Sequence, residues 1–373
     1  MSSTTKHYFS QDFEQSRETF RGHLEKIKKK WPDAELTSTS IGKEQDNTID
    51  MIYSQATGKN ENVIFMSSGE HGIEGYAGAA SIHVFVDEFL DKIDPENNGI
   101  CLIHALNPWG MRNFRRVTEN NVDLNRNYVY NRSELLEDVN KKYENEEELF
   151  VPSHTIKDLK KEKAKLYTDL SKALAREGYS GVKQAKGMGQ FEFEKGVYYG
   201  GKNVEENTLF LKRVQQDLLG NFQRVIHMDW HTALGPSNEV AMVLPGTDSR
   251  DTEEVKDKYG MKNIVRSSTD TIKGDSNNHF YLVKEDYPET YLFSALFEFG
   301  TFGEGKKAEL RELMTIVFEN QLYWEGAEKE EDRQYIMDEF MAMFYPQEEE
   351  WQEDVIKEAR YAIESLLKGE KVL

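Results

Sequence analysis

The chain has only one cysteine among its 373 residues, and it has no long apolar run. A single thiol, Cys101, excludes an intrachain disulfide and a structural zinc site built from cysteines. No stretch reaches the roughly 20 consecutive apolar residues that cross a bilayer. The first residues also lack the apolar core of a secretion signal. We therefore expect a cytoplasmic protein that has no membrane partner.

Positive charge is in short supply as well. The sequence holds 47 Lys and Arg against 67 Asp and Glu, which gives a formal net charge of −20. Such a surface repels a phosphate backbone, so nucleic acid is not an expected partner. Hydrophobic residues make up 38% of the chain, which is enough to build a core under a charged surface. The length and the lack of a clear linker favour one domain over residues 1–373.

Short apolar segments alternate with amphipathic ones along the chain. The alternation predicts an α/β fold, a three-layer α/β/α sandwich around a mixed, mostly parallel central sheet. The expected strands cover residues 37–54 as a hairpin, then 63–66, 100–105, 224–229, 239–244 and 293–299. The expected helices cover residues 12–29, 76–92, 208–219, 306–325 and 355–367. In such a sheet, functional side chains gather beyond the carboxyl ends of the strands.

Residues 131–186 differ in character from the rest of the chain. The segment is highly charged and has a helical pattern, with an acidic run from Glu144 to Glu148. A solvated helical face is the ordinary interpretation of such charge runs. We expect a charged helical insertion that packs on the outside of the domain or forms a lid.

A His-x-x-Glu pair, His71 and Glu74, follows the strand expected at 63–66. Glycines at 69, 72 and 75 let this loop bend tightly, so that both side chains can face one point. An imidazole nitrogen and a carboxylate oxygen are two of the three protein ligands that a catalytic zinc ion often has. The pattern is common by chance, so a zinc site requires a third ligand elsewhere.

Two later strands supply the other candidates. In extended backbone, His227, Asp229 and His231 lie on one face. His231 stands at the end of the strand and is the better third ligand, whereas His227 is expected to pack within the sheet. Glu298 is a single carboxylate in an apolar strand. Burial would raise its pKa, as suits a general base or acid; an exposed strand end or a salt bridge is the alternative.

A run of arginine and amide side chains lies before the charged segment. It contains Arg115-Arg116 and then Val122-Asp123-Leu124-Asn125-Arg126-Asn127. A guanidinium group matches a carboxylate in geometry, and an asparagine adds a neutral donor. The asparagines by themselves fit the capping of turns. The pair Asn125-Arg126 beside a metal loop favours recognition of an anion.

In this order, the motifs resemble those of the zinc carboxypeptidase superfamily. The ordered match comprises His71-x-x-Glu74, Asn107-Pro108-x-Gly110, an arginine, Val122 to Asn127, His231-Thr232 and Glu298. A largely bacterial branch of the superfamily shares three further motifs, here Tyr8-Phe9-Ser10, Tyr199-Gly200-Gly201 and Glu298-Phe299-Gly300-Thr301. The resemblance spans almost the whole chain, and residues 131–186 carry little of it.

The resemblance implies a ligand set and a catalytic pair. His71, Glu74 and His231 would bind one zinc ion per chain, and a water would take the fourth position. Glu298 would deprotonate that water and later protonate the leaving amine. Arg116 would stabilise the oxyanion, with Arg115 as the alternative.

The resemblance also implies how the substrate is held. Asn125, Arg126 and Arg115 would bind the substrate, with Asn125 and Arg126 holding its carboxylate. Asp123 would not bind the zinc ion itself but would orient the ring of His71. The implied partner is a small molecule or peptide with a free carboxylate, and the implied reaction is hydrolysis of the adjacent amide or peptide bond.

Two alternatives stay open. An N-acyl amino acid deacylase of the same fold would use the same metal set, and a catalytically silent carboxylate-binding protein would have no need of Glu298. The tyrosine that carboxypeptidases place near the substrate has no clear counterpart, and the candidates are Tyr198, Tyr199 and Tyr281. Glu70, beside His71, is an additional carboxylate and a rival ligand.

Overall fold

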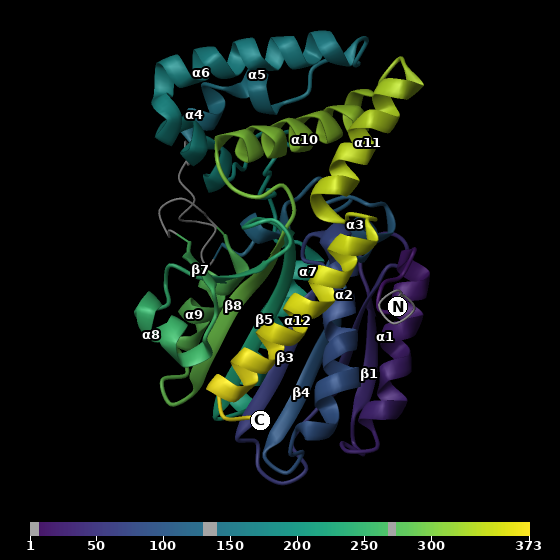
Figure 1. Ribbon diagram of the computed structural model, residues 1–373, viewed down its shortest axis with the longest axis vertical. Helices are drawn as coiled ribbons and strands as arrows, with labels where there is room; N and C mark the ends of the chain where they lie inside the picture. Colours follow the sequence, from purple (N-terminus) through teal and green to yellow (C-terminus); the bar gives the residue numbers. More distant parts are fainter. Residues whose placement is uncertain (1–6, 130–139, 268–273) are drawn as a thin grey trace.

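An eight-stranded mixed sheet runs through the computed structural model, which describes residues 7–129, 140–267 and 274–373 (Figure 1). The strands lie side by side in the order β1-β2-β4-β3-β5-β8-β6-β7. Their bounds are β1 Glu35–Ser40, β2 Thr48–Ser54, β3 Asn62–Ser68, β4 Asn98–His104, β5 Arg224–Ala233, β6 Val240–Leu244, β7 Asn263–Arg266 and β8 Tyr291–Gly300.

Four neighbouring strands, β4, β3, β5 and β8, run parallel to one another. The strands β2 and β6 join them antiparallel on either side, and β1 and β2 pair as the expected hairpin. The parallel strands are almost entirely buried, as helices on both faces require. Their carboxyl ends therefore lie at one edge of the sheet. The predicted α/β architecture with a mixed, mostly parallel sheet is confirmed.

Helices cover both faces of this sheet. Their bounds are α1 Phe13–Ile27, η1 Gly72–Glu74, α2 Gly75–Val84, η2 Phe85–Phe89, η3 Leu90–Lys92, α3 Pro108–Arg112, η4 Leu124–Arg126, α4 Lys141–Glu144, α5 Glu147–Phe150, α6 Leu159–Met188, α7 Glu206–Asn221, α8 Thr252–Tyr259, α9 Ser276–Lys284, α10 Lys306–Glu325, α11 Glu330–Phe344 and α12 Glu349–Gly369. On one face, α1, α2 and α12 pack on Met66, Met228 and Trp230. On the other face, α7 and α9 pack on Phe65 and Val225. The odd-numbered residues of β3 and β5 therefore pack in one core, and the even-numbered residues pack in the other.

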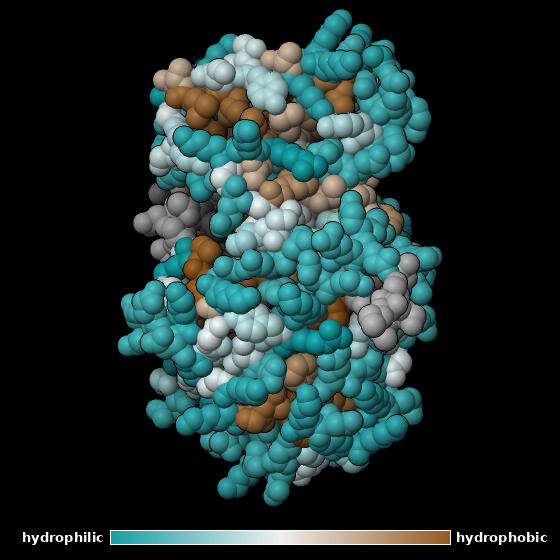
Figure 2. All heavy atoms as spheres, in the orientation of Figure 1, coloured by the Kyte–Doolittle hydropathy of each residue, from teal (hydrophilic) through white to brown (hydrophobic). Residues whose placement is uncertain are grey.

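Five helices, α4, α5, α6, α10 and α11, gather beyond the carboxyl edge of the sheet, and we call them the cap (Figure 1). The cap has a core of its own, whose buried members include Tyr143, Phe150, Phe318 and Ile336. The charged segment expected as an insertion supplies α4, α5 and α6, and its residues 131–139 lie outside the described part. Figure 2 shows hydrophilic residues over most of this side of the molecule, with hydrophobic residues between the cap helices.

Some elements differ from the sequence-based expectation. The single helix expected over 76–92 is α2 followed by a π-helical turn, η2, in which the Leu90 N–H donates to the carbonyl of Phe85. The elements α8, β7, α9 and α11 were not predicted. No helix in the described ranges is both long enough and apolar enough to cross a membrane.

Candidate metal centre

His71, Glu74 and His231 direct their ligand atoms toward one another at the carboxyl edge of the sheet. His71 comes directly before η1, Glu74 ends it, and His231 lies near the end of β5. Glu74 Oε1 is 2.9 Å from His71 Nδ1, and Glu74 Oε2 is 3.0 Å from His231 Nδ1. All three residues are buried, and one ligand atom of each lies within 4.8 Å of the other two.

This donor set fits a zinc ion. Two imidazole nitrogens and one carboxylate leave the fourth tetrahedral position open, as catalytic sites require. Within the described part of the chain, the buried Nδ1 of His71 has no well-aligned hydrogen-bond partner. Burial alone would raise the pKa of Glu74, but His71 and His231 outweigh burial and hold this pKa well below its usual range. Glu74 is therefore the ionised carboxylate that a metal needs at neutral pH.

The other ring nitrogen of His71 faces Asp123 and Arg116. Asp123 Oδ1 is 3.1 Å from His71 Nε2, and Asp123 Oδ2 accepts a 2.6 Å hydrogen bond from Arg116 Nη1. Arg116 Nη2 lies 2.7 Å from the same Nε2. This nitrogen either donates to Asp123 or accepts from Arg116, because it carries either a proton or a lone pair. A metal on Nδ1 leaves the proton on Nε2, so Asp123 then becomes the partner and one Arg116 nitrogen is available to another acceptor.

Carboxylates also lie on the far side of His231. Its Nε2 is 3.3 Å from Asp229 Oδ2 and 3.6 Å from Glu70 Oε2. The Ser67 hydroxyl donates a 2.6 Å hydrogen bond to Asp229 and fixes that carboxylate. Burial alone would lower the pKa of His231, but Asp229 and Glu74 raise it well above its usual value. Glu70, the expected rival ligand, thus approaches the nitrogen that points away from Glu74.

Glu298 stands on β8 directly opposite His231 on β5 in the parallel register. Its side chain is buried, so neither an exposed strand end nor a surface salt bridge describes it. Burial raises the pKa of Glu298 to about 8; the charge of His231 opposes this shift and that of Glu74 adds to it. Within the described residues, Glu298 Oε2 has no hydrogen-bond partner. Such a carboxyl group can both take up and release a proton near neutral pH.

Asn125 and Arg126 lie in the short turn η4, which begins directly after Asp123. Asn125 Oδ1 accepts a 3.1 Å hydrogen bond from the backbone N–H of Ser276 at the start of α9. Arg126 Nη1 donates to the backbone carbonyl of Asn125 at 2.7 Å, and its buried Nε has no partner among the described residues. A buried guanidinium with one such donor atom is suited to an incoming anion.

Tyr198 and Gly189, which follow the charged segment, lie over the two arginines. The Tyr198 ring centroid is 5.5 Å from the guanidinium carbon of Arg116 and 5.7 Å from that of Arg126. Tyr198 also has a positive φ of 55° and belongs to the cap core. At Gly189, a Cβ atom would lie 2.7 Å from Arg126 Cδ. The cap core and the end of α6 therefore contact the side of the site that carries Arg116 and Arg126.

The other two candidate tyrosines are engaged elsewhere. The Tyr199 hydroxyl accepts from the backbone N–H of Lys202 at 3.1 Å, and the Tyr281 hydroxyl accepts from that of Ser294 at 3.1 Å. Of the three, Tyr198 is the one whose ring lies beside both arginines.

Arg115 points away from the candidate metal centre. Its Nε lies 2.6 Å from Glu319 Oε1 on α10, and both side chains are buried. The ring of Tyr323 lies 3.6 Å below its guanidinium carbon. The structure therefore occupies Arg115 with the cap, whereas Arg116 is the arginine that reaches Glu74 and Asp123.

The two sequence motifs around positions 72 and 110 interlock. A Cβ atom on Gly72 would lie 2.1 Å from the backbone carbon of Gly110, so the chains touch there. Asn107 caps α3 by accepting a 2.9 Å hydrogen bond from the Gly110 N–H. The Gly72 N–H donates to the Arg116 carbonyl at 3.2 Å. The loop that carries His71 is thus held by the loop that carries Arg116.

The motif match named Thr232 without giving it a contact, and sequence reasoning missed Ser276. The Thr232 N–H donates to Glu74 Oε2 at 3.1 Å, and the Ser276 hydroxyl donates to Glu70 at 3.3 Å. The alternation of His227, Asp229 and His231 already placed Asp229 on the correct face. No sequence signal marked Ser276, because α9 itself was not predicted.

A family model with the description "Protein of unknown function (DUF2817)" matches residues 9–358. The chain belongs to the DUF2817 family. A search of curated proteins finds no match.

Solved structures resemble this DUF2817 protein over most of its length. Bovine thrombin-activatable fibrinolysis inhibitor, in complex with tick carboxypeptidase inhibitor, superimposes with a TM-score of 0.50 at 13% identity, covering 96% of each chain. Carboxypeptidase A from Helicoverpa armigera gives 0.43 at 11% identity and covers 88% of this chain and 73% of its own. Succinylglutamate desuccinylase from Chromobacterium violaceum gives 0.37 at 11% identity and covers 87% and 74%. The DUF2817 chain has the metallocarboxypeptidase fold, which confirms the resemblance seen in its motifs.

Proposed function

We propose that this protein is a zinc-dependent hydrolase that cleaves an amide or peptide bond next to a free carboxylate. The pairing of His231 with Glu298 across β5 and β8, beside Glu74, carries the proposal. It puts a candidate metal ligand and a buried carboxyl group at the same end of adjacent strands. A water bound between them would meet both a Lewis acid and a base.

His71, Glu74 and His231 would hold one zinc ion per chain. Bound there, zinc supplies Lewis acidity to the scissile carbonyl and lowers the pKa of a water toward about 7. Glu298 takes the proton of the attacking water and delivers it to the leaving amine. Arg116 donates hydrogen bonds to the oxygen that becomes negative in the transition state.

Asn125 and Arg126 would bind the carboxylate of the substrate. Arg126 offers a planar fork of donors, and Asn125 offers an amide beside it. The proposed partner is therefore a small molecule or peptide that ends in a carboxylate. A neutral ester or amide of the same substrate should bind much more weakly.

A deacylase of N-acyl amino acids is the second candidate, and the closed site favours it. His71, Glu74, His231 and Glu298 are each at most 5% exposed. The cap contacts Arg126 through Gly189. An acylated amino acid fits such a site more readily than a long peptide does.

The deciding experiment combines metal analysis with two substrate sets. The purified protein is expected to hold about one zinc ion at this centre and to release either C-terminal residues from short peptides or amino acids from their N-acyl derivatives. Glu298→Gln should keep the zinc and lose about 10²- to 10⁴-fold in kcat, the usual contribution of a general base.

Glu239→Gln is the matched control, because this partly exposed glutamate lies directly before β6 and its carboxylate accepts a hydrogen bond from the Asn263 amide. Its activity should equal that of the wild type. A protein that holds zinc but hydrolyses neither substrate set would instead be a silent carboxylate-binding protein. Equal turnover by wild type and Glu298→Gln would remove Glu298 from the mechanism.

A further inference from the structure

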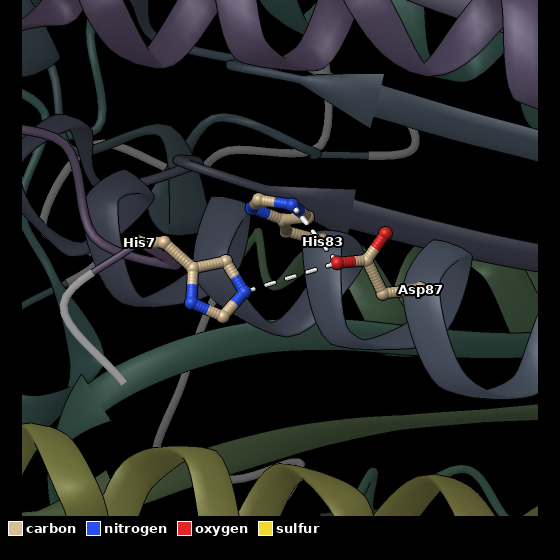
Figure 3. Close-up of side chains that lie close together, drawn as sticks. All are labelled: His7, His83 and Asp87. Atoms are coloured by element: carbon tan, nitrogen blue, oxygen red, sulfur yellow. Dashed lines mark ion pairs between the residues drawn. The ribbon is translucent and has the colours of Figure 1, made fainter. Parts of the chain in front are cut away.

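A second group of side chains of the types that can bind a metal lies at the far end of α2 from the candidate metal centre. His83 is in the last turn of α2, Asp87 is in the π-helical turn η2, and His7 comes from the N-terminal segment. Asp87 Oδ2 is 3.3 Å from His83 Nε2 and 3.9 Å from His7 Nε2. Figure 3 shows both imidazole rings directed at this carboxylate. One ligand atom of each residue lies within 4.8 Å of the other two.

These separations are close to those of a metal-bound set. With bonds of about 2.0–2.1 Å to a tetrahedral ion, neighbouring ligand atoms lie roughly 3.4 Å apart. The His83–Asp87 separation of 3.3 Å already has this value. The His7–Asp87 separation of 3.9 Å requires a small rotation, which is open to His7 because its side chain is 48% exposed.

Contacts within the chain hold these residues in place. The Tyr8 hydroxyl donates a 2.9 Å hydrogen bond to Glu88, and Arg360 on α12 donates to the same carboxylate at 2.7 Å. The Tyr8 ring also packs edge-on against His83, 4.9 Å between centroids. Because Tyr8 is fixed by these contacts, its sequence neighbour His7 already lies beside His83. Metal binding therefore does not have to order this part of the chain.

The local backbone also favours a site here. Single π-helical turns inside helices occur frequently at functional sites, and η2 carries Asp87. Lys26 is the opposing group, since its ammonium lies 3.1 Å from the other oxygen of Asp87. Lys26 is partly exposed and can move away from the carboxylate.

We propose that His7, His83 and Asp87 bind one divalent ion of the late first transition series, zinc being the reference. A water completes the tetrahedron. Imidazole and carboxylate ligands suit this class of ion. The ion would join the N-terminal segment to α2, the helix that starts directly after Glu74. This second site does not depend on the function proposed above.

The test is a zinc titration of the full chain after dialysis against metal-free buffer. Wild type is expected to bind one more Zn²⁺ than His83→Ala or Asp87→Asn, and added Zn²⁺ should raise the Tm of wild type more than that of either variant. His7→Ala should lower the Zn²⁺ affinity of this second site at least about tenfold. Lys26→Ala should raise that affinity by removing a nearby positive charge.

His154→Ala is the matched control, because His154 is an exposed histidine that pairs with Glu162 elsewhere on the surface. Its stoichiometry should equal that of wild type. Asp87→Asn keeps the shape of the side chain. It therefore tests the second site even if His83→Ala does not fold. Equal zinc stoichiometry in wild type, His83→Ala and Asp87→Asn would overturn the proposal. Because the readout is a difference of one ion at this cluster, it is distinct from a failure of the candidate metal centre.

Discussion

Asp123 holds the outer nitrogen of His71: its Oδ1 lies 3.1 Å from Nε2, while Nδ1 faces Glu74 at 2.9 Å. Asp123 is itself fixed by Arg116 and by the backbone N–H of Asn125, which donates to it at 3.1 Å. A carboxylate so placed sets the tautomer and the orientation of a metal-binding imidazole. The candidate centre therefore depends on a residue that does not face the proposed metal.

Removing the charge of Asp123 should weaken zinc binding. Asp123→Asn is expected to lower zinc affinity about 10- to 100-fold, the usual effect of changing a residue behind a metal ligand. Competition with a chelator of known affinity measures the change. Asp217→Asn, on an exposed position of α7, is the control and should bind zinc as wild type does. Unchanged affinity in Asp123→Asn would show that Asp123 does not orient His71.

The buried pair of Arg115 and Glu319 should support stability and not turnover. Arg115→Met leaves Glu319 buried without its partner, which costs about 3–5 kcal/mol of unfolding free energy. The double variant Arg115→Met/Glu319→Met removes both charges and should recover most of this loss. Thermal unfolding gives the stability, and kcat per folded molecule should stay near the wild-type value. A rise in KM with no change in Tm would instead place Arg115 at the substrate.

Gly72 has no room for a side chain, because the loop that carries Gly110 touches the loop that carries His71. A methyl group there would lie 2.1 Å from Gly110 backbone, so Gly72→Ala must displace the loop that carries His71. We expect a loss of zinc affinity and of about 1–3 kcal/mol of unfolding free energy. Gly22→Ala is the matched control, because nothing lies within 4 Å of its Cβ position in α1. That change should stabilise the protein by up to about 1 kcal/mol.

Buried histidines should make the protein sensitive to acid. Burial lowers the pKa of His104 to about 4, with Asp50 opposing the shift, and its Nε2 contacts the Ser16 hydroxyl at 2.8 Å. In the unfolded chain a histidine takes up its proton near pH 6.5. Between these values the unfolded state binds more protons, so stability falls as pH falls from about 6.5 toward 4.

His104→Gln removes one of the groups responsible. The fall in Tm between pH 7 and pH 5 should be smaller in this variant than in wild type. His154→Gln, at an exposed position, should leave the fall unchanged. Some loss of stability at low pH should remain in His104→Gln, because burial also lowers the pKa of His227 to about 4. An identical pH profile for His104→Gln and wild type would contradict the assignment.

The sequence predicted the elements that have strong apolar patterns. The strands β3, which ends at Ser68, and β8, which ends at Gly300, were found because buried parallel strands are short apolar runs. The helix α9 was not, because its first turn, Ser276 to Asn278, is polar and its apolar stripe is short. The helix α11 was overlooked although Ile336, Phe340 and Met343 recur at helical spacing.

The candidate ligands could be proposed from motif order, but their surroundings could not. Nothing in the sequence says that Arg115 turns to Glu319 while Arg116 turns to Asp123, since adjacent residues carry the same side chain. Their different directions result from tertiary contacts with α10 and with η4. The approach of Tyr198 to both arginines likewise depends on how the cap sits on the sheet.

Because His231 and Glu298 lie on different strands, the candidate site can form only late in folding. His71 and Glu74 are neighbours in sequence, whereas His231 and Glu298 join them only once β5 and β8 have docked in register. A growing or partly folded chain therefore possesses two of the three proposed ligands and no base beside them. The proposed hydrolysis would begin only in molecules in which β8 has docked, and tight zinc retention would report that β5 has joined β3.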